Sequence, residues 1–87
     1  MLTENPERFC YVVIFQCPDY MAEGTYVSTV SLEINDKHEA INIAKKEINY
    51  LINNGKVSYT YDVDDFLLVA IVEVDWEARE VDIFNVF

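Results

Sequence analysis

Carboxylates are the side chains whose number and spacing could do chemistry in this sequence, and they concentrate near its C-terminal end. Residues 57–87 hold eight acidic residues and one basic residue, a net charge of −7, whereas residues 1–56 carry −3. Closely spaced carboxylates can bind cations, and they can also occupy Lys and Arg side chains that would otherwise contact nucleic-acid phosphates. Both kinds of chemistry require that the fold bring these residues onto one surface.

The last acidic residues alternate with aliphatic ones, which is typical of a β-hairpin with one apolar and one polar face. Four aliphatic side chains must share the face toward the core: Val72, Val74, Val81 and Ile83. An even-length loop then sets Asp75 opposite Glu80, and the same register sets Glu73 opposite Asp82. Four carboxylates are therefore expected together on the outer face as two opposed pairs. Each pair costs roughly a few tenths of a kcal/mol.

Further residues near the hairpin extend this expected surface. The predicted partner-binding residues are Tyr59, Tyr61, Asp62, Asp64, Asp65, Glu73, Asp75, Glu77, Glu80 and Asp82. Tyr59 and Tyr61 flank the acidic turn, where exposed tyrosines are good interface anchors. The turn lacks the glycine and the terminal glutamate of a calcium loop, so we expect no metal site. The alternative is a solvated edge hairpin whose charge blocks edge-to-edge aggregation.

The other residues with catalytic potential do not form a motif. His38, the single histidine, falls on the polar face of an expected helix, and the sequence places no nucleophile or second acid to work with it. Cys10 and Cys17 are seven residues apart in one expected strand, so an odd offset points them to opposite faces and prevents a disulfide. We therefore expect neither an enzyme nor a bound cofactor. An active site assembled only by folding is the alternative.

The overall charge limits the classes of partner. The 87-residue chain has a formal net charge of −10 and a pI near 4.2, which argues against direct binding to nucleic acid or an anionic membrane. A basic protein surface is the expected partner. Four lysines give the helix side only a solvated basic face: Lys37, Lys45, Lys46 and Lys56. Without a signal peptide or an 18-residue apolar span, the protein is expected in the cytoplasm, where thiols stay reduced.

Hydrophobic periodicity predicts the strands that position these residues. The run Arg8–Cys17 is apolar on both faces, which is typical of a central strand covered on both sides. Thr25–Asn35 alternates as a half-exposed strand. Phe66–Trp76 and Glu80–Phe87 are the two strands of the acidic hairpin, and Val57–Tyr61 is a candidate short strand.

One helix is expected between the second strand and the hairpin. Asp36 and Glu39 have the spacing of a capping box, and Asn53-Asn54-Gly55 supplies a C-terminal stop. Apolar residues recur at helical spacing along one side: Ala40, Ile41, Ala44, Ile48, Leu51 and Ile52. With 52% hydrophobic residues and only two glycines and two prolines, residues 1–87 are expected to form a single small α+β domain.

The predicted fold is a single antiparallel sheet of four to five strands with one helix packed on one face, in the order β-β-α-(β)-β-β. One helix covers only one face, whereas the first strand is apolar on both. A second copy of the protein, or a partner, is therefore expected to cover the other face. The predicted dimer interface is one side of the first strand: Phe9, Tyr11, Val13 and Phe15.

In fold class and charge the chain resembles small phage and mobile-element proteins, of the anti-CRISPR-like kind, that disable host nucleic-acid-directed machinery. No family motif accompanies this analogy. The opposed carboxylate pairs of the hairpin are the feature that predicts a non-enzymatic inhibitor or regulator, which could act as a homodimer, presenting an acidic, nucleic-acid-mimicking surface to a basic partner. The alternative is a homodimeric interaction module or subunit whose acidity serves only solubility.

Overall fold

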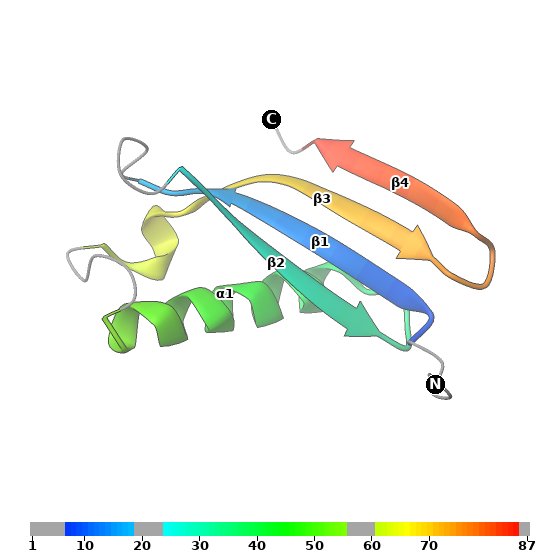
Figure 1. Cartoon of the computed structure of the whole chain (residues 1–87), viewed down its shortest axis with the longest axis horizontal. Helices are drawn as coiled ribbons and strands as arrows, with labels where there is room; N and C mark the ends of the chain where they lie inside the picture. The colour runs from blue at the N-terminus through cyan, green and yellow to red at the C-terminus, as the bar shows by residue number, and fades with distance from the viewer. Residues whose placement is uncertain (1–6, 19–23, 56–60, 86–87) are drawn as a thin grey trace.

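The computed structural model describes residues 7–18, 24–55 and 61–85, which form one antiparallel sheet and one long helix (Figure 1). In chain order the elements are β1 (Phe9–Gln16), β2 (Thr25–Leu32), α1 (Lys37–Asn53), the 3-10 helix η1 (Val63–Asp65), β3 (Leu67–Asp75) and β4 (Glu80–Asn85). The strands lie in the order β2-β1-β3-β4, and all neighbours are antiparallel. The predicted α+β class is therefore confirmed. The extra strand expected at 57–61 falls almost entirely outside the described residues.

β1 is a central strand, because β2 and β3 flank it, but within the chain α1 covers only one of its two apolar faces. Its burial alternates residue by residue, with one side buried and the other half-buried. The pairing of β1 with β3 shifts register between Ile14 and Phe15, where Val69 is the extra residue of a β-bulge. The bulge bends the beginning of β3, which follows directly on η1 and Phe66.

α1 begins and ends where the sequence predicts. The Asp36 side chain accepts a hydrogen bond from the Glu39 backbone N–H at 3.1 Å and so caps the first turn. Beyond the last turn, Gly55 has a φ of 71°, a left-handed conformation that suits glycine. α1 packs on β2, β1 and η1, and β4 lies at the sheet edge farthest from the helix (Figure 1). The buried helix side chains are Ala40, Ala44, Ile48 and Ile52.

The predicted dimer interface is wrong in its choice of face. Its four side chains lie in the core beneath α1: Phe9, Tyr11, Val13 and Phe15. The three large rings fill the space between helix and sheet, where they bury more apolar surface than the smaller side chains of the opposite face could. These four residues are therefore inaccessible to a second copy. The uncovered side of β1 carries Cys10, Val12 and Ile14 instead, all half-buried.

The β3–β4 hairpin has the predicted register, but its faces are the reverse of those expected. Glu73 pairs with Asp82, and Asp75 pairs with Glu80. Across the sheet, however, Glu73 pairs with Tyr11, whose side chain is in the core beneath α1. Residues that pair directly point to the same side, so the carboxylates lie on the helix side of the sheet. The aliphatic residues of the hairpin face away from the helix.

We expect Asp36→Ala to lower the free energy of unfolding by about 1 kcal/mol, because the Glu39 N–H loses its acceptor. Urea unfolding measures the change. Asn42→Ala, an exposed substitution within α1, is the control and should shift stability by less than about 0.5 kcal/mol. Equal losses in the two variants would show that the cap contributes nothing.

Candidate functional site

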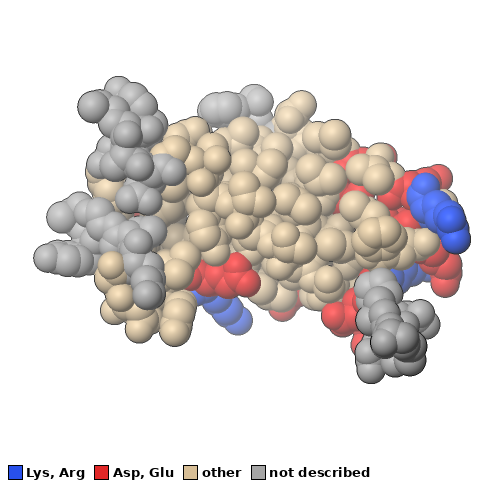
Figure 2. All heavy atoms as spheres, viewed as in Figure 1, with Lys and Arg blue, Asp and Glu red and all other residues tan. Residues whose placement is uncertain are grey.

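The fold gathers carboxylates from separate parts of the chain at one end of the molecule. Phe9, at the start of β1, pairs with Leu32 on one side and Asp75 on the other, so the end of β2 and the β3–β4 turn lie together. We call this group the acidic end: Glu33, Asp36, Glu73, Asp75, Glu77, Glu80 and Asp82. Acidic side chains gather at this end in the space-filling view (Figure 2). Glu33 and Asp36 were not predicted, because only strand pairing brings them beside the hairpin.

Asp75 stabilises the structure of the acidic end, and its carboxylate is already occupied by hydrogen bonds within the chain. Arg8, 67 residues earlier in the chain, donates to its two carboxylate oxygens at 2.9 and 3.0 Å. This pairing, helped by backbone N–H groups of Glu77 and Ala78, lowers the pKa of Asp75. Arg8 also lies 2.9 Å from a carboxylate oxygen of Glu77. One arginine therefore forms ion pairs with two of the predicted binding carboxylates.

Glu73 is also unavailable to a partner, since its exposed fraction is 6%. The Tyr11 hydroxyl donates to Asn35 Oδ1 at 2.7 Å and lies 3.4 Å from Glu73 Oε2. This contact ties β1, β3 and the loop before α1 together beneath the helix N-terminus, whose dipole favours negative charge. Glu80 and Asp82 remain exposed on β4, and they are the hairpin carboxylates outside these ion-pair and buried contacts.

We expect stability to fall as the pH rises from 10 toward 12. Burial, and then the charge of Glu73, raise the pKa of Tyr11 from 10.0 to about 12. The folded state therefore holds this proton more tightly than the unfolded state. The resulting stabilisation is complete below pH 10 and is lost as the pH rises toward 12.

Tyr11→Phe is the comparison that isolates this titration. Urea unfolding across this pH range should show a steeper loss of stability in the wild type than in Tyr11→Phe. The tyrosines shared by both proteins contribute equally to the two curves. Parallel curves would contradict the assignment to Tyr11.

The acidic turn before β3 lies at the opposite end of the sheet. Its carboxylates serve local structure, because Asp62 accepts from the Val63 N–H and Asp65 accepts from the Asp62 N–H, both at 2.9 Å. Asp64 is exposed, and Tyr61 is half-buried against the core. β3 separates this turn from the hairpin turn by nine residues, or about 30 Å. The predicted surface is therefore divided into two separate acidic sites, and Tyr59 lies outside the described residues.

Among the described residues, the paired strand positions on the sheet face away from α1 carry no charged side chain, and we call this face the open face. Its apolar members are Cys10, Val12, Ile14, Val27, Val72, Val74, Val81 and Ile83. Val81 and Ile83 are 60% and 65% exposed, and Trp76 at the end of β3 is also exposed. Ala70 and Leu67 are also on this face, and its remaining paired positions are the uncharged polar residues Ser, Thr, Gln and Asn. A broad uncharged area over the strands is visible in Figure 2, with acidic side chains toward its borders.

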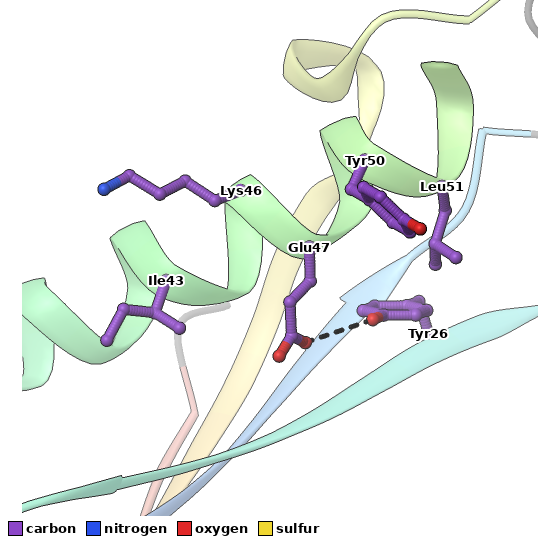
Figure 3. Close-up of a pocket in the computed structure, with 6 residues that line it drawn as sticks. All are labelled: Tyr26, Ile43, Lys46, Glu47, Tyr50 and Leu51. Carbon is purple, nitrogen blue, oxygen red and sulfur yellow. Dashed lines mark hydrogen bonds between the residues drawn. The ribbon is translucent and has the colours of Figure 1, made fainter. Parts of the chain in front are cut away.

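A shallow hollow of about 410 Å³ lies between α1 and β2 (Figure 3). It is lined by Tyr26, Ile43, Lys46, Glu47, Tyr50 and Leu51. The Glu47 carboxylate accepts hydrogen bonds from the Tyr26 hydroxyl at 3.2 Å and from the Ser28 hydroxyl. Burial, and then the charge of Glu47, raise the pKa of Tyr26. These contacts link the helix to the sheet edge, so Glu47 has a structural role that sequence spacing alone did not indicate.

The remaining candidate residues lie apart from one another. His38 is exposed in the first turn of α1, Cys10 is half-buried on the open face and Cys17 is buried after β1, with no disulfide between them. In the described ranges, no three His, Cys, Asp or Glu side chains are grouped closely enough to hold a metal ion.

No helix within these ranges has the length and apolar character needed to cross a membrane. Comparisons of the chain with protein-family models, curated proteins and solved structures found no match.

Proposed function

We propose that this protein is a non-enzymatic binding protein that presents its acidic end to a basic protein surface. The observation that carries the proposal is the convergence of exposed carboxylates from the loop before α1 and from the β3–β4 hairpin. Glu80 and Asp82 project from the same side of β4, about 7 Å apart along the strand. Such a row of charges can occupy the Lys and Arg side chains of a nucleic-acid-binding groove.

On this proposal, fewer residues contact the partner than the sequence predicted. Glu80 and Asp82 supply the direct contacts, with the exposed residues Glu33 and Glu77 at the border. Glu73 and Asp75 hold the hairpin in place. The finer hypothesis, an inhibitor of nucleic-acid-directed machinery acting in the cytoplasm, requires that the basic partner be a nucleic-acid-binding protein.

A competition experiment with a defined probe tests the proposal. A fluorescent DNA duplex is bound to an arginine-rich peptide, and the protein is titrated in to release the duplex. We expect Glu80→Lys with Asp82→Lys to weaken this release by about tenfold, because two attractions of up to about 1 kcal/mol each become repulsions. The release should also fade as salt rises to 1 M, where the Debye length is about 3 Å.

The matched control carries the same total change in charge elsewhere on the surface. It combines Asp64→Lys with Asn42→Lys and Asn49→Lys, all at exposed positions away from the acidic end. We expect it to release the duplex nearly as well as the wild type. If both variants weaken equally, only the net charge matters and the acidic end is not the binding site.

A further inference from the structure

We propose that a second copy of this chain covers the open face, in a face-to-face dimer whose two helices lie on the outside. The motivating observation is that one sheet face is covered by α1 while the other presents half-buried and exposed aliphatic side chains to solvent. Contiguous apolar surface of more than a few hundred Å² is uncommon on monomers and marks interaction sites.

Charge selects a second copy as the occupant. Strand alternation places Glu73, Asp75 and their partners on the helix side, and the paired positions of the open face carry no charged side chain. A basic partner finds no carboxylate to pair with at the centre of this face. Two chains with a net charge of −10 repel each other at most other surfaces, but here they meet through a face whose paired strand positions carry no charge and whose one end is bordered by the cationic Arg79. The face is therefore self-complementary, as a two-fold symmetric interface requires.

The dimensions of the face suit such an interface. Four strands spaced about 4.8 Å apart, each with about seven residues rising 3.3 Å, give a flat area of roughly 440 Å². Side-chain relief adds to this area, and so does Trp76, which is 51% exposed and belongs to a residue type that buries about 150–250 Å². Two such faces together approach the roughly 1,000 Å² total that a specific interface needs.

Two twisted antiparallel sheets have a standard way to pack. Their strands cross at about 30° and the sheets lie about 10 Å apart, with aliphatic side chains interdigitating between them. A hollow of about 490 Å³ lies at one end of the open face, lined by Val74, Trp76, Arg79 and Val81. Side chains of the second copy have room to enter it. All the carboxylates of the hairpin stay on the outer surfaces of the resulting sandwich.

Sedimentation equilibrium of the full chain across a concentration series tests the proposal. We expect a dimer for the wild type and at least about a 100-fold weaker association for Ile83→Lys, because symmetry buries two unpaired ammonium groups. Ile34→Lys is the matched control, since Ile34 is 67% exposed and Ile83 is 65% exposed, but Ile34 lies in the loop after β2. The control should remain dimeric. A wild type that stays monomeric, or equal weakening in both variants, overturns the proposal.

A chemical readout at the centre of the face provides a second test. Cys10 lies on the open face, and we expect its alkylation by iodoacetamide to be slower in the dimer than in Ile83→Lys. Mass spectrometry of the Cys10 peptide during dilution measures the rate. Equal rates at all concentrations, for both proteins, would contradict coverage of this face.

Salt separates this inference from the proposed function. The dimer is held by apolar contact between like-charged chains, so raising salt from about 0.1 M to 1 M should strengthen it by screening their repulsion. Binding of a basic partner at the acidic end should weaken over the same range. If the dimer dissociates as salt rises, the interface is not apolar and the dimer proposal is wrong. That result does not bear on the acidic-end proposal, which the duplex-release experiment tests separately.

Discussion

Val13→Asp is expected to unfold the protein, whereas the same substitution one residue earlier, Val12→Asp, should leave it folded. Val13 is 0% exposed beneath α1, and an unpaired carboxylate there costs several kcal/mol. A domain of this size has about 0.05–0.15 kcal/mol of stability per residue, so the loss is comparable to the whole. Val12 lies half-buried on the open face, where the substitution costs about 1 kcal/mol through its lower β propensity.

Circular dichroism with urea unfolding measures both variants. They are best compared in the Ile83→Lys background, so that loss of a dimer does not add to the cost at Val12. Similar stability losses at the two positions would mean that α1 does not cover the Val13 face of β1 in preference to the Val12 face. That outcome would restore the aromatic side of the strand as a candidate interface.

Ile48→Ala is expected to lower the free energy of unfolding by about 2–5 kcal/mol, because it removes three buried carbons and leaves a cavity between helix and sheet. Ile48 is 1% exposed and is among the largest fully buried side chains. For a domain of 60–100 residues, each kcal/mol shifts Tm by about 4–8 °C. The variant should therefore melt at least about 8 °C below the wild type.

Ile34→Ala makes the same chemical change at an exposed position and serves as the control. Ile34 is 67% exposed, so we expect a change within about 0.5 kcal/mol. A small effect at Ile48, close to that at Ile34, would show that α1 does not carry the core. Thermal and urea unfolding followed by circular dichroism report both results.

The acidic residues of this chain have different structural roles although all of them carry the same charge. Asp36, Asp62 and Asp65 cap helical turns, and Asp75 holds Arg8 and the hairpin turn. The charge of Glu80 and Asp82 is not used in any of these contacts. Net charge alone therefore overstates the size of a binding surface, since a carboxylate that satisfies backbone N–H groups or an arginine is already occupied.

Local patterns determined the elements of this protein. Asp36 and Gly55 set the limits of α1 because caps depend on a few adjacent residues. The alternation of carboxylates and valines fixed the register of β3 with β4, since a slip of one residue would reverse every side chain. These features are short-range, and the sequence therefore contained enough information to predict them.

Only the tertiary structure decided which face of the sheet is the core. Both sides of β1 are apolar, so alternation groups Phe9 with Val13 and Cys10 with Val12 but does not say which group α1 covers. Packing decides it, because the rings of Phe9, Tyr11 and Phe15 fill the space under the helix. That choice placed the hairpin carboxylates on the helix side and brought Arg8 to Asp75. Contacts across 67 residues depend on the whole fold, and no local pattern specifies them.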